Sequence, residues 1–215
     1  MKVIGLGAGG HAKVVIDILQ TAGDCELVGL LDATSLLQGK TIMGVPILGG
    51  DDMLPELRGQ GVTHAFIGVG SIGDTRQREQ LYKRLRQYGF EIVNAIHPQA
   101  VISPSVKMRQ GVTIMAGCII NAYVRLGANV VVNSGSIVEH DSVVGDHAFI
   151  GPGARLGGTV DIGTGAHIGI GATLLQNIRV GKNAVVGAGA VVLTDVPDDT
   201  VVVGVPARAL RRTDS

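Results

Sequence analysis

The sequence has 215 residues, enough for one or two domains with hydrophobic cores. Its eighteen basic and eighteen acidic residues cancel, so no overall charge favours nucleic acid or a membrane surface, and an aromatic content of 3% argues against base-stacking surfaces. Charged or small residues interrupt every apolar stretch, so no membrane span is expected. The isolated Cys25 and Cys118 form no disulfide framework and no signal peptide is recognisable, so we expect a soluble cytoplasmic protein.

The first 95 residues alternate between strand and helix patterns. Strands are expected at 1–6, 26–31, 65–69 and 90–95, and helices at 11–22, 51–57 and 74–88, with Asp51 as a possible cap of the second helix. The segment 40–50 has the composition of a loop. This alternation predicts an α/β, Rossmann-like domain over residues 1–95, with a small parallel sheet and covering helices.

A glycine motif follows the first expected strand. Gly5, Gly7 and Gly10 are spaced as in a dinucleotide fingerprint, and Asp32 stands at the end of the next strand. Backbone N–H groups at such a helix N-terminus bind phosphate, and the acid binds ribose. About four strands make half of a dinucleotide fold, which favours one nucleotide attached to another group over NAD. A purely structural glycine turn is the alternative.

The second half of the sequence is organised by a period of six. Every sixth position from 96 to 192 is aliphatic: Ile96, Ile102, Met108, Ile114, Ile120, Leu126, Val132, Val138, Val144, Ile150, Leu156, Ile162, Ile168, Leu174, Val180, Val186 and Val192. This is the signature of a β-helix built from hexapeptides, in which three hexapeptides form one coil of 18 residues. Residues 18 apart then stack on one face, and the aliphatic column forms a continuous core. We expect a β-helix domain over residues 96–215, with a C-terminal tail.

The six histidines offer candidates for chemistry. Their spacing differs from that of hexapeptide proteins that bind zinc through histidines, so no metal site is expected. His140 and Asp141 follow the inward Val138 and should share a corner of the coil, where the carboxylate can hold the imidazole as a base. Gly158 is 18 residues after His140, which predicts open space and a groove beside the base. Surface decoration is the alternative interpretation of this pair.

Four motifs together resemble a known family. They are Gly-Ala-Gly-Gly-His at 7–11, Asn-Ala-Ile-His-Pro at 94–98, the segment 133–141 that ends in Glu-His-Asp, and Gly-Val-Pro-Ala at 204–207. Together they resemble bacterial sugar acyltransferases of the sialic acid O-acetyltransferase family, which have a left-handed parallel β-helix. The chain is most similar to the N-acetyltransferases of nucleotide-linked 4-amino-4,6-dideoxyhexoses, of the perosamine and bacillosamine-pathway type.

The resemblance implies roles for particular residues. It implies that His140 is the catalytic base, that Asp141 is its acidic neighbour and that Asn133 positions the reacting groups. It also implies a homotrimer whose active sites lie between subunits. The implied acetyl-CoA site contains Gly158, Ile170, Ala188 and Pro206. The implied nucleotide-sugar site contains Gly9, Gly10, His11, Asp32 and Gly70. Phe149 stands where some relatives have a second histidine, whose role would be lost or taken by His147.

The implied reaction is direct acetyl transfer from acetyl-CoA to the sugar amine of a UDP- or GDP-linked sugar. His140 would accept the proton, and a backbone N–H of the Gly157-Gly158 turn would stabilise the oxyanion. Sugar O-acetylation is the nearest alternative. An NAD-dependent oxidoreductase and a non-catalytic nucleotide-binding solenoid are alternatives from other classes.

Overall fold

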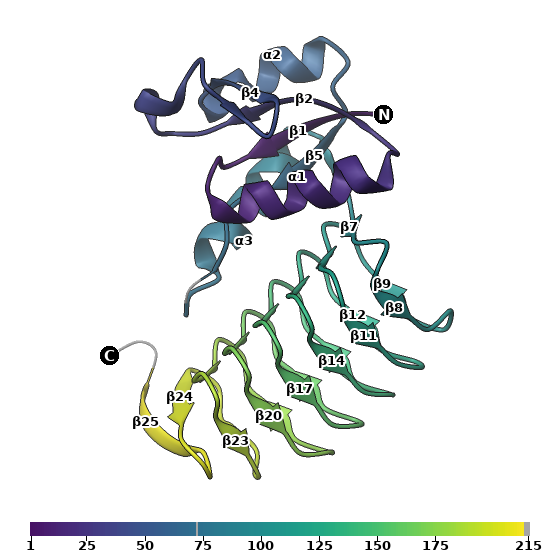
Figure 1. Ribbon diagram of the computed structural model, residues 1–215. Helices are drawn as coiled ribbons and strands as arrows, with labels where there is room; N and C mark the ends of the chain where they lie inside the picture. The colour runs from purple at the N-terminus through teal and green to yellow at the C-terminus, as the bar shows by residue number, and fades with distance from the viewer. Residues whose placement is uncertain (72, 213–215) are drawn as a thin grey trace. The chain divides into compact units, whose positions relative to one another are not determined.

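The computed structural model describes residues 1–71 and 73–212 (Figure 1). The chain forms two compact units. The first consists of Met1–Gly70 and Gln77–Pro98, and the second joins Ser71–Arg76 to the chain from Gln99 onward. Within the described part, no helix combines the length and apolar character that crossing a bilayer requires.

The first unit is built on a six-stranded sheet. Its order is β3-β4-β2-β1-β5-β6, and all neighbours are parallel except the antiparallel pair β3 and β4. The strands are β1 (Lys2–Leu6), β2 (Glu26–Leu31), β3 (Thr41–Ile42), β4 (Val45–Gly49), β5 (His64–Ile67) and β6 (Glu91–Ile92). The helices are α1 (Gly10–Ala22), α2 (Leu54–Gly59) and α3 (Arg76–Gln87), with short 3-10 turns at Ser35–Leu37 and Asp51–Met53.

Helices cover both faces of this sheet (Figure 1). α1 buries Val15, Ile16 and Ile18, which recur at helical spacing, and it ends at Gly23, whose φ of 75° continues no helix. On the other face, Leu54 and Leu57 of α2 and Leu85 of α3 belong to one apolar cluster with the inward residues of β1 and β5. The sequence pattern located these elements to within a few residues.

The prediction of a loop at residues 40–50 is wrong. β3 and β4 form a hairpin there, closed by Met43 and Gly44 with φ values of 50° and 80°, and β4 then pairs in parallel with β2. Pro46 discouraged a strand assignment, yet it lies on the exposed side of a strand whose Val45 and Ile47 are buried. Asp51 does not cap a helix either: Gly50 precedes the turn, and no side-chain cap bond forms.

The second unit is a left-handed parallel β-helix with three stacked sheets. One sheet has the order β23-β20-β17-β14-β11-β8 and another the order β21-β18-β15-β12-β9, while the third runs from β10 through β13, β16, β19 and β22 to β24 and β25. Successive strands in a sheet are 18 residues apart and in register, as Ile137↔Arg155 and Val138↔Leu156 illustrate. Two-residue strands recur every six residues from β7 (Ala95–Ile96), which belongs to the first unit, to β23 (Val191–Val192). Those between them are β8 (Val101–Ile102), β9 (Lys107–Met108), β10 (Thr113–Ile114), β11 (Ile119–Ile120), β12 (Arg125–Leu126), β13 (Val131–Val132), β14 (Ile137–Val138), β15 (Val143–Val144), β16 (Phe149–Ile150), β17 (Arg155–Leu156), β18 (Asp161–Ile162), β19 (His167–Ile168), β20 (Thr173–Leu174), β21 (Arg179–Val180) and β22 (Val185–Val186).

The aliphatic column is the core of this β-helix. Every member from Ile114 to Val192 is at most 2% exposed. Burying one such side chain contributes about 1.5–3 kcal/mol. Glycines follow the column where coils stack closely: a Cβ on Gly145 would stand 2.7 Å from the Thr164 nitrogen in the next coil. The six-residue period therefore specifies both the core and the spacing of the coils.

The repeat ends in an antiparallel pair. β24 (Thr200–Val203) continues one sheet in parallel with β22, and β25 (Arg208–Arg212) folds back antiparallel to β24. The expected polar tail at 211–215 therefore begins inside a strand, and residues 213–215 lie outside the described part.

Candidate active site

His140 and Asp141 lie at a corner of the β-helix, directly after β14. The chain turns here because Asp141 adopts a left-handed φ of 59°, a conformation that Asp tolerates better than most residues. Stacking holds the corner from both sides: the Asp141 N–H donates to the Ala122 carbonyl at 3.0 Å, and the Thr159 N–H donates to the His140 carbonyl at 2.8 Å. The corner predicted from the phase of Val138 is therefore present.

The two side chains form a pair. His140 Nδ1 lies 2.9 Å from Asp141 Oδ2, and the side chains are 58% and 56% exposed. A carboxylate can only accept a hydrogen bond, so Nδ1 carries the proton and Nε2 of the neutral ring is free to accept one. This is the arrangement of a general base with an orienting acid, on a surface that substrates can reach.

Gly158 lies under the His140 ring. A Cβ at this position would stand 2.7 Å from His140 Nε2 and 2.8 Å from Cε1. The sequence predicted open space at this point, but the imidazole itself fills the space that the missing side chain leaves. The glycine thus leaves room for the imidazole against the next coil, so the space predicted to be open below the base is occupied by the base itself.

Of the two backbone N–H groups in the Gly157-Gly158 turn, only one remains a candidate for the oxyanion donor. The Gly157 N–H donates to the Leu174 carbonyl at 3.0 Å as part of the stacking between coils. It is therefore engaged within the fold, and the candidate in this turn is the N–H of Gly158.

Asn133 lies at a different corner from His140. It follows β13, and its side-chain oxygen accepts a hydrogen bond from its neighbour, the Ser134 N–H, at 2.8 Å. The structure therefore does not place Asn133 beside His140 within one coil. Its corner is instead the one that carries the predicted cofactor residues Ile170 and Ala188.

Ile170 and Ala188 stack in one column on neighbouring coils. The Gly189 N–H donates to the Ile170 carbonyl at 2.8 Å, and both side chains are exposed, Ile170 to 62%. Gly158 lies at the neighbouring corner, so these three residues border the sheet that contains β14, β17 and β20. Pro206 is exposed in the turn between β24 and β25. The arrangement offers an exposed strip that leads along the β-helix towards His140.

The first unit contains a pocket of about 420 Å³ where the carboxyl ends of its parallel strands meet. Asp32 lines it, and its two carboxylate oxygens accept hydrogen bonds from the Ala8 and Thr34 N–H groups, each at 2.8 Å. Burial tends to raise the pKa of Asp32, but the hydrogen bonds from Thr34 and Ala8 outweigh it and hold that pKa below its ordinary value. Asp32 therefore carries a negative charge at neutral pH.

The glycines of the motif divide into two groups. A Cβ on Gly5 would collide with Phe66, and a Cβ on Gly7 would collide with Val69. The packing of the first unit therefore requires both glycines. A Cβ on Gly9 or Gly10 would meet nothing within 4 Å. These two glycines therefore leave the N-terminus of α1 open to a ligand's phosphate.

His11 lies beside Gly70, as the predicted site requires. A Cβ on Gly70 would stand 3.5 Å from the His11 Cβ. Burial, together with the nearby charge of Arg78, lowers the pKa of His11 to about 3. Burial lowers the pKa of Arg78 to about 9, and its guanidinium donates to the Val69 carbonyl at 2.5 Å. His11 is therefore a neutral imidazole at physiological pH.

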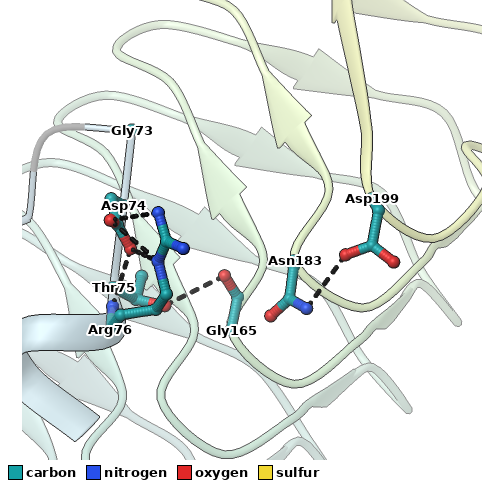
Figure 2. A pocket seen from close by; sticks show the side chains of 7 residues that line it. All are labelled: Gly73, Asp74, Thr75, Arg76, Gly165, Asn183 and Asp199. Atoms are coloured by element: carbon teal, nitrogen blue, oxygen red, sulfur yellow. Dashed lines mark hydrogen bonds and ion pairs between the residues drawn. The ribbon is translucent and has the colours of Figure 1, made fainter. Parts of the chain in front are cut away.

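A second, smaller pocket of about 150 Å³ belongs to the β-helix unit (Figure 2). The hydroxyl of the buried Thr75 donates to the Gly165 carbonyl at 3.1 Å, and the Asn183 amide donates to the Asp199 carboxylate at 3.0 Å. These bonds join the segment around Thr75 and the last coils to the β-helix. We interpret this pocket as structural, because its polar groups already bond one another.

Known proteins share this combination of units. A family model described as "PglD N-terminal domain" matches residues 2–85, and another described as "Bacterial transferase hexapeptide (six repeats)" matches residues 123–158. A UDP-N-acetylbacillosamine N-acetyltransferase from Bacillus subtilis is 34% identical over 113 residues, which are 52% of this chain and 50% of that protein. The alignment thus spans about half the length of this curated relative.

Solved structures match over nearly the whole chain. One is a histidine-to-alanine mutant of GDP-perosamine N-acetyl transferase from Caulobacter crescentus in complex with CoA and GDP-perosamine, with a TM-score of 0.92 and 40% identity, covering 98% of this chain and 97% of that chain. Another is the acetyltransferase domain of PglB from Neisseria gonorrhoeae with acetyl coenzyme A, with a TM-score of 0.88, 35% identity and coverage of 97% and 98%. The chain belongs to the nucleotide-amino-sugar N-acetyltransferases. The fold and family predicted from the sequence are therefore confirmed, and the predicted class of reaction, acetyl transfer from acetyl-CoA, is that of this family.

Two further histidines of this family member are part of its packing. His147 is buried, and its Nδ1 lies 3.0 Å from the Asn129 amide nitrogen. The His167 ring stacks on Phe149, with centroids 4.8 Å apart and planes 4° from parallel, and burial lowers its pKa. His147 is thus held at a corner other than that of His140. Within the described part, no three His, Cys, Asp or Glu side chains gather as a metal-binding cluster.

Sequence reasoning missed part of the pocket in the first unit. Asp51, Gln77, Gln80 and Arg84 line it together with Asp32. The three α3 residues are spaced i, i+3 and i+7 and so share one helix face, a pattern that is visible in the sequence. Nothing in the sequence showed that this face would meet Asp51, which the sequence suggested was a helix cap.

Proposed function

We propose that this protein transfers the acetyl group of acetyl-CoA to the 4-amino group of a nucleotide-linked 4-amino-4,6-dideoxyhexose. The observation that carries this proposal is the exposed His140–Asp141 pair on a hexapeptide β-helix, in a chain 40% identical to a GDP-perosamine N-acetyl transferase. The structure of that relative contains CoA and GDP-perosamine although a histidine is replaced by alanine, so this histidine is not required for binding them. A catalytic base has this property.

The chemistry follows from the pair. The neutral sugar amine attacks the thioester carbonyl, and His140 Nε2 accepts a proton from the nitrogen as the tetrahedral intermediate forms. Asp141 stabilises the resulting imidazolium through Nδ1. The intermediate then collapses, the C–S bond breaks, and the imidazolium returns its proton to the departing thiolate. No covalent enzyme intermediate is needed, and the Gly158 N–H is the proposed oxyanion donor.

Acetyl-CoA would lie along the exposed strip of the β-helix. Ile170, Ala188, Gly158 and Pro206 are the residues proposed to contact it, and Asn133 shares the corner of Ile170 and Ala188. Because Asn133 does not lie beside His140 within a coil, its proposed positioning role suits a site completed by a second subunit.

A homotrimer is part of the proposal. Val101 and Ile119 point outward in register on one sheet, and they are 65% and 36% exposed. An exposed apolar ladder of this kind is typical of a surface that packs against another chain. We propose that the active sites lie between neighbouring β-helices, where the His140 corner of one copy meets the Asn133 corner of the next.

The nucleotide-sugar is proposed to bind the first unit, predicted as residues 1–95. Asp32 would bind the ribose, Gly9 and Gly10 the phosphates, and the neutral His11 with Gly70 the sugar end. Cys118 is buried as a free thiol, which suits a reducing compartment, so we propose the cytoplasm as the site of action.

Coenzyme A release tests the proposal. The purified protein is incubated with acetyl-CoA and a panel of UDP- and GDP-linked 4-amino sugars, and the released thiol is measured. Release with at least one amino sugar, together with an N-acetylated product by mass spectrometry, supports the proposal. Release only with the matched 4-hydroxy sugars would assign O-acetylation instead, and no release with any acceptor would overturn the proposed function.

A further inference from the structure

The pocket in the first unit contains two carboxylates with different surroundings. Asp32 follows β2 and Asp51 follows β4, and these strands are neighbours whose ends are joined where the Asp32 N–H donates to the Gly49 carbonyl at 2.8 Å. Backbone N–H groups bind both oxygens of Asp32. Asp51 instead pairs with a side chain, Arg84 Nη1, at 2.5 Å through its Oδ2.

Asp51 and Arg84 remain within reach of a ligand. Their side chains are 23% and 52% exposed, and both line the pocket. Their ion pair engages one oxygen of the carboxylate and one nitrogen of the guanidinium, so each group retains further hydrogen-bonding positions. An acceptor and a donor of opposite charge thus lie side by side in a pocket that Asp32 already suits to a ribose.

A guanine base has the complementary edge. Its N1–H and N2–H₂ are adjacent donors that match the two oxygens of one carboxylate, while its O6 and N7 are acceptors that match an arginine. Asp51 would accept from the donor pair, and Arg84 would donate to the acceptor side. Leu31, Val69 and Leu81 supply apolar surface for the ring.

Uracil can engage Arg84 through a carbonyl oxygen, but it offers only one donor to the Asp51 carboxylate. It has a single donor, N3–H, between two carbonyl oxygens. A carboxylate that accepts from N3–H places its second oxygen against one of these carbonyls, where two acceptors repel each other. A site built around a hydrogen-bonded pair discriminates strongly against a base that leaves part of the pair unmatched.

We propose that Asp51 and Arg84 read the base of the nucleotide-sugar, and that this protein selects a guanosine diphosphate sugar over a uridine diphosphate sugar. The inference rests on the proposed function, since it names the nucleotide of that substrate. Gln77 and Gln80, on the same face of α3 as Arg84, supply further amide groups along the pocket. Asp51 and Arg84 are therefore specificity-determining residues, not catalytic ones.

Isothermal titration calorimetry with GDP and UDP tests the base preference without requiring catalysis. The wild-type protein should bind GDP about 10- to 100-fold more tightly than UDP. Asp51→Asn replaces one acceptor by a donor and should weaken GDP binding by a similar factor while leaving UDP binding nearly unchanged. Asp52→Asn is the matched control, because Asp52 is exposed and lies outside the pocket, and it should keep the wild-type preference.

The outcomes separate this inference from the proposed function. Equal affinity of the wild type for GDP and UDP, or an Asp51→Asn variant that loses both nucleotides equally, would overturn the base assignment while nucleotide-sugar acetylation could stand. Failure of the wild type to bind either nucleotide would overturn both. Thermal unfolding of the two variants shows that a lost preference reflects recognition and not misfolding.

Discussion

The ring of His140 rests on the backbone of Gly158 in the next coil. A Cβ at position 158 would stand 2.7 Å from His140 Nε2, the atom proposed to accept the proton. Gly158 follows His140 by 18 residues, which is one coil of the β-helix. The absence of a side chain at position 158 therefore determines the position of the His140 ring.

Gly158→Ala should therefore displace the base. The new methyl group would push the imidazole away, and a shift of about 1 Å is enough to lower kcat by about 100-fold. The free energy of unfolding should change little, because the flexible ring can move. Steady-state kinetics measures the effect. Gln176→Ala, one coil further along the same column, is the control and should keep its activity; normal kcat in Gly158→Ala would contradict this role for the glycine.

Asp141→Asn should abolish the correct tautomer of His140. Asn tolerates the left-handed φ of 59°, so the corner should be preserved. Its amide would donate to Nδ1 and leave the proton on Nε2, so that the ring could no longer act as a base. We expect kcat to fall by about 10²- to 10⁴-fold with little change in the affinity for acetyl-CoA. A variant with wild-type kcat and an unchanged pH profile would exclude the orienting role of Asp141.

Ile168 and Ile170 are two residues apart but serve different purposes. Ile168 is 0% exposed in the core, whereas Ile170 is 62% exposed on the proposed cofactor strip. Ile168→Ala should lower the free energy of unfolding by about 2–5 kcal/mol. Ile170→Ala should leave stability unchanged and raise KM for acetyl-CoA by about tenfold. Urea unfolding and kinetics of both variants distinguish these roles, and an unaltered KM in Ile170→Ala would remove Ile170 from the cofactor site.

His11 should make the first unit sensitive to acid. The unfolded chain binds a proton at His11 near pH 6.5, whereas the folded protein holds the pKa of His11 at about 3. Between these pH values the unfolded state binds more protons than the folded state. The contribution of His11 to the free energy of unfolding is therefore complete above pH 6.5 and decreases as the pH falls. The contribution at pH 5 is a loss of about 2 kcal/mol. Urea unfolding at pH 7.5 and pH 5 should show a smaller loss in His11→Gln, and an identical loss would refute the buried neutral imidazole.

The periodic parts of this molecule were predictable, and the long-range contacts were not. The column through Val138 located the core and the His140 corner because a β-helix repeats one local geometry. The hairpin before Gly49 was missed because Pro46 normally disfavours strands, and only the buried Val45 and Ile47 compensate for it. The Asp51–Arg84 pair joins residues 33 positions apart, and no periodicity relates them.

The sequence predicted the residues of the candidate site better than their arrangement in space. Motif resemblance named Asn133 and His140 together, but the coil geometry places them at different corners. A single sequence carries no information about which corner of a second copy completes a site. The period also predicted empty space at Gly158, because spacing alone does not show that the neighbouring imidazole folds onto it.

Turnover by His140→Ala with acetyl-CoA and the preferred nucleotide-linked 4-amino sugar, measured beside acetyl-CoA binding by calorimetry, tests directly whether His140 is the base. We expect kcat to fall by about 10²- to 10⁴-fold while the Kd for acetyl-CoA is nearly unchanged, because the base acts on the proton and not on the cofactor. Turnover close to that of the wild type would contradict this role of His140.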